Sequence, residues 1–321
     1  MAARTTESVV IGGRAITLSN AGKVLWPLDG YTKGDLVAYY RSVARWLIPH
    51  LQNRPLTLQR YPDGIDAQSF FEKQAPKYKP DWIPTVALAA DANSRKVSYM
   101  MCNDEAALVW CANLAAIVLH VWYSHVPTTD TPDYALFDLD TCEKTTTKTL
   151  ATVALAFREQ LEAIGLPVLV KTSGGSGLHV VIPLKNKYDY DMVKQFAEIV
   201  AHRVNHLLPG ETTLERAVSR RPKTAVYLDW VQVGRGKTVV PPYVARARSG
   251  APVSMPLDWS EVEDMRRKRG TPEDVIGQWT IKTAPKRIAA QGDLWAARAW
   301  KPAALERALK TAQTAWAVKP G

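Results

Sequence analysis

The sequence is poor in cysteine: it contains Cys102, Cys111 and Cys142, an odd number without the CxxC spacing of metal or redox sites. This excludes a disulfide framework and gives no sign of a zinc site. No stretch reaches the roughly 18 apolar residues of a membrane span, and the first residues lack the apolar core of a signal peptide. Internal repeats and low-complexity linkers are also absent. We expect a soluble protein of the reducing bacterial cytoplasm, associated with the nucleoid.

Several common catalytic motifs are missing as well. The segment GRGKT resembles a phosphate-binding P-loop, but Val231 stands where that pattern requires glycine. His202 and His206 lack the glutamate of a zinc HExxH helix, so we expect them on the surface. His120 follows a long apolar run, where a histidine is more often part of a hydrogen-bonded core than a ligand. No catalytic triad can be assigned.

Positive charge is abundant. The 321 residues include 41 Lys and Arg against 31 Asp and Glu, a net charge of +10, and 46% are hydrophobic. The length allows one large domain or two smaller ones. The charge favours a polyanionic partner such as nucleic acid, although a basic protein without such a partner has the same composition.

Strand and helix patterns alternate along the chain and predict a mixed α/β fold. The expected strands and helices are a hairpin over 7–20, helices over 33–47 and 104–121, and then, in order, a strand over 134–140, a helix over 147–164, strands over 168–172 and 178–184, a helix over 190–208 and a strand over 225–233. Turn residues cluster at 128–133, which predicts an N-terminal module over 1–128 and a catalytic module over 129–321. Residues 260–316 are expected to wrap the second module.

Two carboxylates end the first strand of the second module. Asp138 and Asp140 are two positions apart, so they share one face of the strand, and Asp229 lies within a later strand. Buried carboxylates are costly unless they are paired or bind metal, and three on one sheet suit Mg²⁺ or Mn²⁺. The alternative is that each aspartate caps a strand or pairs with an arginine.

A glycine-rich turn, KTSGGSGLHVVIPL, follows at residues 171–184. Its backbone N–H groups, the Ser173 and Ser176 hydroxyls and His179 could bind phosphate, although a plain hairpin reads the same way. Lys237, Arg246 and Arg248 form a cationic cluster in the sequence after Asp229, suited to a triphosphate.

Six ordered segments together resemble the polymerase domain of bacterial DNA ligase D, within the archaeo-eukaryotic primase superfamily. They are QRYPDGID, SFFEKQAP, FDLD, TSGGSGLHVVIPL, LDWVQ and KTVVPPYVARAR. The resemblance implies a primase-type catalytic core, with an RRM-like sheet-and-helix module packed against an N-terminal α/β module. It also implies a template-directed nucleotidyltransferase that uses two Mg²⁺ or Mn²⁺ ions and NTPs or dNTPs.

The resemblance assigns roles to particular residues. Asp138, Asp140 and Asp229 would bind the metal ions, and a second set would bind the incoming nucleotide: Ser173, His179, Gln232, Lys237 and Arg246. A third set would recognise a downstream DNA 5′-phosphate: Asn20, Lys23 and Lys33. Phe70, Phe71 and, less directly, Arg60 would contact the template. Ser176 departs from the basic residue that many relatives carry in the turn. Without the resemblance, Lys23 and Lys33 would be taken as ordinary surface lysines.

The function expected from these features is the filling of short gaps at DNA breaks in non-homologous end joining, with ribonucleotides preferred. Ku and a DNA ligase or nuclease are expected as partners. A stand-alone primase-polymerase in excision repair or lesion bypass stays open, as does a non-catalytic nucleic-acid-binding module. Three retained aspartates argue against the last, because carboxylates repel phosphates.

Overall fold

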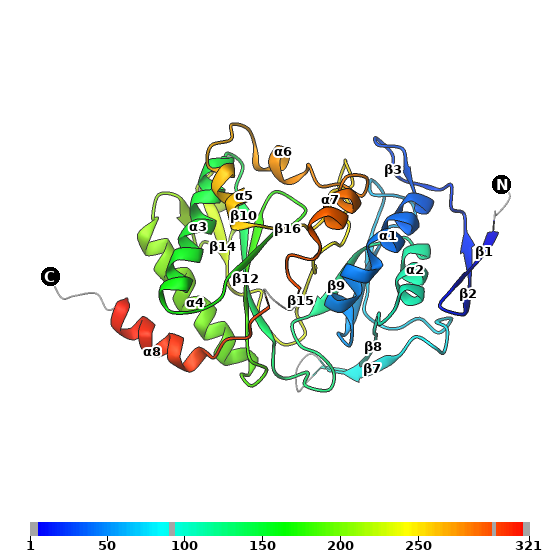
Figure 1. The fold of residues 1–321 in the computed structure, drawn as a ribbon, viewed down its shortest axis with the longest axis horizontal. Coiled ribbons are helices and arrows are strands. Elements are labelled where there is room, and N and C mark those ends of the chain that lie inside the picture. Colours follow the sequence, from blue (N-terminus) through cyan, green and yellow to red (C-terminus); the bar gives the residue numbers. More distant parts are fainter. Residues whose placement is uncertain (1–5, 90–93, 297–299, 317–321) are drawn as a thin grey trace. The chain divides into compact units, whose positions relative to one another are not determined.

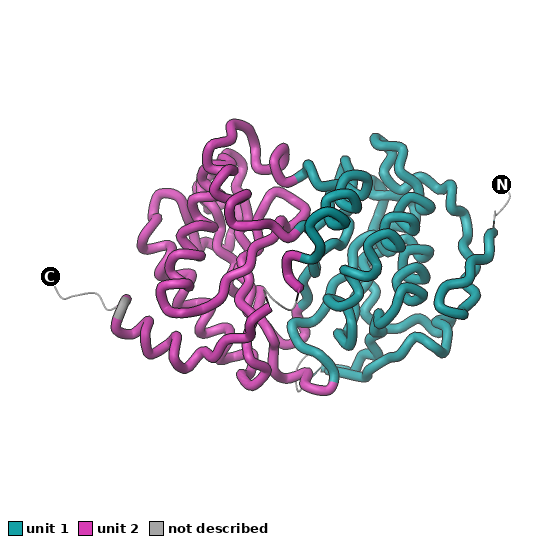
Figure 2. Tube along the Cα trace, in the orientation of Figure 1, with its two compact units in different colours: residues 1–126, 238–255, 277–293 teal, residues 127–237, 256–276, 294–321 magenta. Residues whose placement is uncertain are grey.

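The computed structural model describes residues 6–89, 94–296 and 300–316. The chain forms two compact units (Figure 2): unit 1 comprises residues 1–126, 238–255 and 277–293, and unit 2 comprises 127–237, 256–276 and 294–321. The sequence pattern assigned all of 129–321 to one module, whereas two later segments return to unit 1. The first of them carries β15 (Thr238–Val239), which pairs with β9 (Ala116–Trp122). Pairing between such distant segments leaves no local pattern.

Unit 1 is built on a sheet of strand order β15-β9-β5-β8-β7, with β6 paired to β5 (Figure 1). Its other strands are β1 (Thr6–Ile11), β2 (Arg14–Ser19), β3 (Val24–Trp26), β4 (Tyr31–Thr32), β5 (Leu56–Arg60), β6 (Phe70–Glu72), β7 (Thr85–Leu88) and β8 (Val97–Met100). Its helices are α1 (Lys33–Leu51), α2 (Glu105–Asn113) and α7 (Ala284–Gln291). The predicted hairpin is confirmed, since β1 and β2 pair around Gly12 and Gly13.

The long helix expected over 104–121 is wrong. The helix ends at Asn113, Ala115 has a φ of 56°, and the chain continues as β9. A left-handed backbone at Ala115 breaks the helical ladder. The apolar run that follows is buried as a sheet strand rather than as a helix, because it pairs with β5. Apolar runs of this kind do not distinguish the two.

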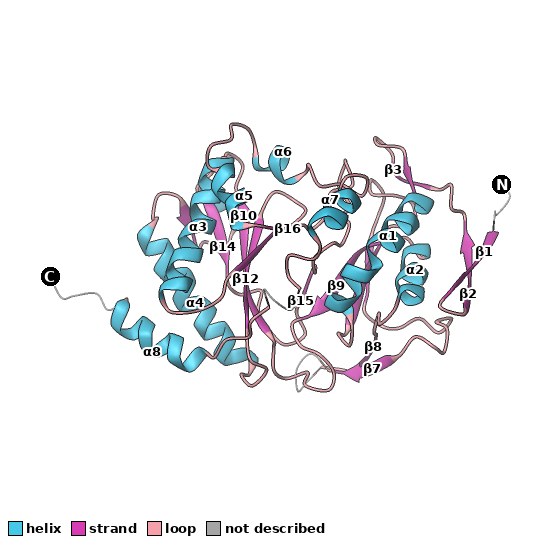
Figure 3. Ribbon diagram, viewed as in Figure 1, coloured by secondary structure: helices cyan, strands magenta, loops and turns pink. Residues whose placement is uncertain are grey.

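Unit 2 carries a second sheet, of strand order β13-β14-β10-β12-β11-β16. Its strands are β10 (Tyr134–Thr141), β11 (Leu169–Thr172), β12 (Leu178–Pro183), β13 (Thr212–Thr213), β14 (Val226–Asp229) and β16 (Pro256–Leu257). Its helices are α3 (Thr147–Ala163), α4 (Tyr190–Leu207), α5 (Trp259–Met265), α6 (Pro272–Ile276) and α8 (Leu305–Ala315), with a 3-10 turn at Val218–Arg220. Strands and helices alternate in both units, as the predicted α/β class requires (Figure 3).

Helices α3 and α4 pack against β10. The Phe137 ring of β10 contacts the Phe157 ring of α3, with centroids 4.7 Å apart. Phe137 and Leu139 therefore face the helices, and the alternate residues Asp138 and Asp140 face the other way. Among the described residues, no helix is long and apolar enough to cross a membrane.

Candidate active site

A row of four polar residues crosses the unit 2 sheet. Asp138 of β10 is directly opposite Asp229 of β14 on one side and His179 of β12 on the other, and His179 is opposite Lys171 of β11. The His179 Nε2 lies 3.3 Å from the Asp138 Oδ1. Residues that face each other across strands share one face of the sheet. The fold thus brings together residues from four separate strands.

The environment of Asp229 shifts the pKa of its carboxyl group. Burial raises the pKa of its carboxyl group, and the charge of Asp138 raises it further. The Val231 N–H and the Gln232 Nε2 each donate to this carboxylate at 3.1 Å, which favours its ionised form. These two bonds also end the strand at Asp229, so the strand predicted over 225–233 is shorter in the structure.

Lys237 lies near this carboxylate, and the charge of Asp229 acts to raise the pKa of its amine. Burial is the larger influence and lowers that pKa, helped by the charges of Lys194 and Arg216. The Lys237 amine donates to the Val231 carbonyl. Gln232 and Lys237 therefore both lie at the end of β14, next to the third aspartate.

The donor set has the chemistry of a site for a hard divalent cation, because carboxylate oxygens are the ligands that Mg²⁺ and Mn²⁺ prefer. Among the described residues, however, no three His, Cys, Asp or Glu side chains already stand as a metal cage. The carboxylates suit a divalent cation, and the positive charge of such an ion would attract them toward one another.

The glycine-rich turn is held tightly against β10. The Ser173 hydroxyl accepts the N–H groups of Gly175 and Gly177 at 3.1 and 3.2 Å, so these donors are used inside the turn. A Cβ at Gly177 would lie 2.3 Å from the Leu139 carbonyl oxygen. Only glycine allows the turn to approach β10 between its two aspartates. The Ser176 hydroxyl accepts a hydrogen bond from the Thr141 hydroxyl at 2.6 Å.

Arg246 belongs to unit 1, where its charge acts on His120. Burial and this charge lower the pKa of His120 to about 3, and its Nε2 is buried without a hydrogen-bond partner in the described structure. His120 lies on β9 and its ring contacts Phe71 edge-on, with centroids 5.5 Å apart. His120 is therefore largely buried, as expected, but its Nε2 lacks the hydrogen bond expected of a core histidine.

The two phenylalanines of β6 are exposed, Phe70 by 43% and Phe71 by 58%. Neighbouring strand residues point to opposite faces. The Arg60 guanidinium lies 5.2 Å from the Phe70 ring centroid and bonds the Glu72 carboxylate at 3.1 Å. Adjacent exposed aromatics of this kind are typical of a binding surface.

Three N-terminal polar residues meet where the chain enters α1. The Lys23 N–H donates to the Asn20 carbonyl at 3.0 Å, and the Lys33 N–H donates to the Lys23 carbonyl at 2.8 Å. The Lys23 amine pairs with Asp63 at 2.6 Å. Lys33 is only 6% exposed, and its amine donates to the Asn113 carbonyl at 3.0 Å. Lys33 is therefore not an ordinary surface lysine.

Residues 32–295 match the family model of the LigD primase-polymerase domain. The chain belongs to this family. Its members are nucleotidyltransferases, as the sequence motifs predicted for this chain.

Similar proteins agree with this assignment. The multifunctional non-homologous end joining DNA repair protein LigD of Mycobacterium tuberculosis is 34% identical over 287 residues, which cover 87% of this chain and 36% of that protein. The bifunctional LigD of Bacillus subtilis is 29% identical over 278 residues, 86% of this chain and 43% of the relative. This primase-polymerase domain thus spans less than half the length of either relative.

A solved structure is similar in fold. The polymerase domain from Mycobacterium tuberculosis ligase D in complex with DNA matches with a TM-score of 0.77 and 33% identity, covering 87% of this chain and 96% of that one. The predicted primase-type fold is confirmed by this likeness.

Two residues of this primase-polymerase domain, Lys171 and Gly177, escaped the sequence analysis as parts of the unit 2 site. Lys171 was quoted only as part of a motif, yet it is 1% exposed and directly opposite His179. Gly177 sets the distance between the turn and β10. The only local sign of this role in the sequence was that Lys171 is a charged residue within an apolar strand.

Proposed function

We propose that this domain extends a primer 3′ end across short gaps at DNA breaks in non-homologous end joining. It would copy a template strand, prefer ribonucleotides and hold a downstream 5′-phosphate. The single observation that carries the proposal is Asp138 lying in register with Asp229 on one side and His179 on the other. Carboxylates for metal ions beside a phosphate-binding histidine are what phosphoryl transfer needs.

In the proposed mechanism, Asp138, Asp140 and Asp229 would hold two Mg²⁺ or Mn²⁺ ions. Such ions activate a primer hydroxyl and neutralise the charge of a triphosphate. Gln232 orients Asp229 through its 3.1 Å hydrogen bond. His179 and Lys237 would donate to phosphate oxygens of the nucleotide, and Ser173 would hold the turn that positions His179.

The DNA would be recognised through unit 1. A terminal 5′-phosphate carries enough charge to compete with Asp63 for the Lys23 amine, because that ion pair is exposed and weak. Lys33 and Asn20 are fixed close to Lys23 by backbone hydrogen bonds. Phe70 and Phe71 would stack on template bases, a contact that tolerates any sequence. The solved relative bound to DNA supports a DNA substrate.

The test is primer extension on a gapped duplex with Mn²⁺, comparing 5′-phosphate with 5′-hydroxyl downstream ends and NTPs with dNTPs. We expect faster extension with NTPs and with the 5′-phosphate. Lys23→Ala should abolish the advantage of the phosphate, whereas Lys286→Ala, at an exposed lysine of α7, should keep it. Equal extension with 5′-phosphate and 5′-hydroxyl downstream ends would indicate a general primase-polymerase instead. Intact DNA binding without extension would leave a binding module.

A further inference from the structure

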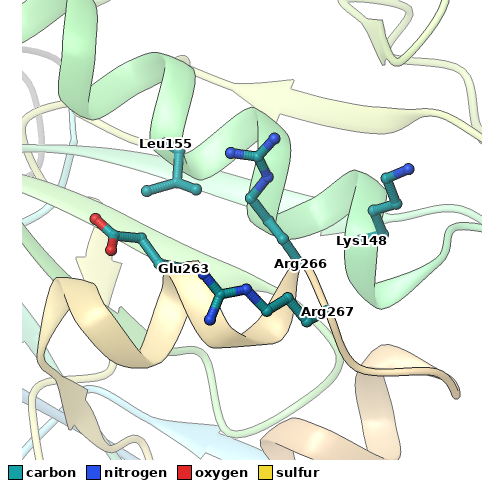
Figure 4. A pocket seen from close by; sticks show the side chains of 5 residues that line it. All are labelled: Lys148, Leu155, Glu263, Arg266 and Arg267. Atoms are coloured by element: carbon teal, nitrogen blue, oxygen red, sulfur yellow. The ribbon is translucent and has the colours of Figure 1, made fainter.

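A basic groove lies in the helical layer of unit 2, between α3 and the C-terminal end of α5 (Figure 4). It is open to solvent, has a volume of about 500 Å³ and is lined by Lys148, Leu155, Glu263, Arg266 and Arg267. The Arg266 side chain reaches toward α3, and the Arg267 side chain points toward Glu263 (Figure 4). None of these residues has a role in the proposed reaction.

The groove and the carboxylates belong to opposite faces of the sheet. Phe137 contacts Phe157 of α3, so the helical layer covers the Phe137 face, while Asp138 and its neighbours in register occupy the other. A ligand in the groove therefore cannot touch the reacting end of a primer. The groove is a separate site.

The charge of the groove is positive. Its one acid, Glu263, is paired with Arg158 at 3.1 Å. Arg267 lies 3.4 Å from Asp264, but both side chains are largely exposed, so the pair contributes little. Within the described part of the chain, Lys148 and Arg266 form no ion pair. The exposed Lys268 and Arg269 follow Arg266 and Arg267 directly, so residues 266–269 form a run of four cations.

The run of cations is fixed at both ends rather than free in solvent. Met265 is 3% exposed at its start, and Pro272 is buried at the start of α6. The buried Thr147 hydroxyl donates to the Gly270 carbonyl at 2.9 Å, which ties the run to the first turn of α3 beside Lys148. Holding like charges together costs free energy unless an anion offsets them. The anchoring indicates a preformed surface for such an anion.

We propose that this groove binds the sugar-phosphate backbone of a nucleic acid segment away from the reacting end. Guanidinium forks match phosphate oxygens, several cations in succession suit a repeating anion, and the Leu155 side chain offers an apolar contact for sugars. The choice of nucleic acid over an acidic peptide rests on the proposed function. The existence of an anion site rests only on the groove and its cations.

The test measures binding of a fluorescein-labelled blunt DNA duplex without 5′-phosphate, by anisotropy over a series of salt concentrations. The variants are the whole chain carrying Arg266→Glu with Arg267→Glu, and the milder Arg266→Ala with Arg267→Ala. The matched control is Arg307→Glu with Lys310→Glu on the exposed face of α8. All of these side chains are exposed, and cooperative thermal unfolding checks that each variant folds.

We expect the alanine pair to weaken DNA binding by about tenfold and to reduce the slope of log affinity against log salt concentration by about two. The charge-reversal pair should have a larger effect, and the α8 control should bind like wild type. Extension of a gapped primer should persist in the groove variants. An unchanged slope, or an equal loss in the control, overturns the inference. Competition by polyglutamate as strong as that by unlabelled duplex also overturns it and assigns the groove to an acidic protein. If the wild-type protein fails to extend a primer but the groove variants still show a reduced salt slope, the proposed function is wrong and the anion site stands.

Discussion

Asp138 and Asp229 lie directly opposite each other on adjacent antiparallel strands, with their carboxylates on the same face of the sheet. The pKa of Asp229 is raised by burial and by the charge of Asp138. The folded protein therefore carries like charges face to face, which is unfavourable in the absence of a cation.

Asp138→Asn should stabilise the metal-free protein. Removing one of two opposed charges is worth about 1 kcal/mol, which raises the melting temperature by a few degrees. Mn²⁺ should raise the melting temperature of wild type more than that of the variant. Thermal unfolding in EDTA and in Mn²⁺ measures both effects. A destabilised variant that still gains as much from Mn²⁺ would contradict the metal assignment.

Gly177→Ala should displace the glycine-rich turn. Its new methyl group would lie 2.3 Å from the Leu139 carbonyl oxygen, so either the turn or β10 has to move. We expect a loss of about 1 to 3 kcal/mol of unfolding free energy and a large loss of extension activity. Gly210→Ala is the control, because nothing lies within 4 Å of a Cβ there. Chemical denaturation compares the two, and equal stabilities would refute the close approach.

Lys171→Met should weaken nucleotide binding. Lys171 is buried with its Cα opposite that of His179, and two strand spacings put its Cα about 10 Å from that of Asp138. At that distance a unit charge contributes about 1 to 2 kcal/mol to the binding of an anion. We expect KM for the nucleotide to rise about tenfold with a smaller change in kcat, and Lys171→Arg to recover part of it. Steady-state extension provides the test. Equal losses in kcat from both variants would indicate a packing role instead.

His120 should make stability depend on acid. Its pKa of about 3 in the folded protein lies below the ordinary value of 6.5. Above pH 6.5 the ring is neutral in both states, so its contribution is fully present. As the pH falls from 6.5 toward 3, the unfolded chain binds a proton that the folded protein excludes, and stability is lost. The unfolding free energy of wild type should therefore fall more steeply than that of His120→Gln. Parallel curves for the two proteins would rule this out.

Local patterns predicted much of unit 2. The alternation around Asp138 and Asp140 placed both carboxylates on one strand face, and β10, α3, β12 and α4 lie within a residue or two of their expected bounds. The metal and nucleotide roles came from ordered motifs and stay proposals. The structure adds the register, which makes neighbours of residues that are far apart in the sequence.

The failures have a common cause. An apolar run carries no mark that distinguishes a buried helix from a buried strand, so β9 was missed. The pairing of β15 with β9 and the proximity of Arg246 to His120 join distant segments. Lys171 gains meaning only from its partner on β12. No single-sequence pattern encodes such pairings.

The most direct measurement is the rate of primer extension by Asp229→Asn in Mn²⁺, with DNA affinity determined on the same preparation. Asp81→Asn, at an exposed aspartate of unit 1, is the control. The catalytic assignment predicts that Asp229→Asn loses at least about a thousandfold in rate while its DNA affinity stays within about twofold. Extension near the wild-type rate would contradict the assignment and show that Asp229 is not needed for the reaction.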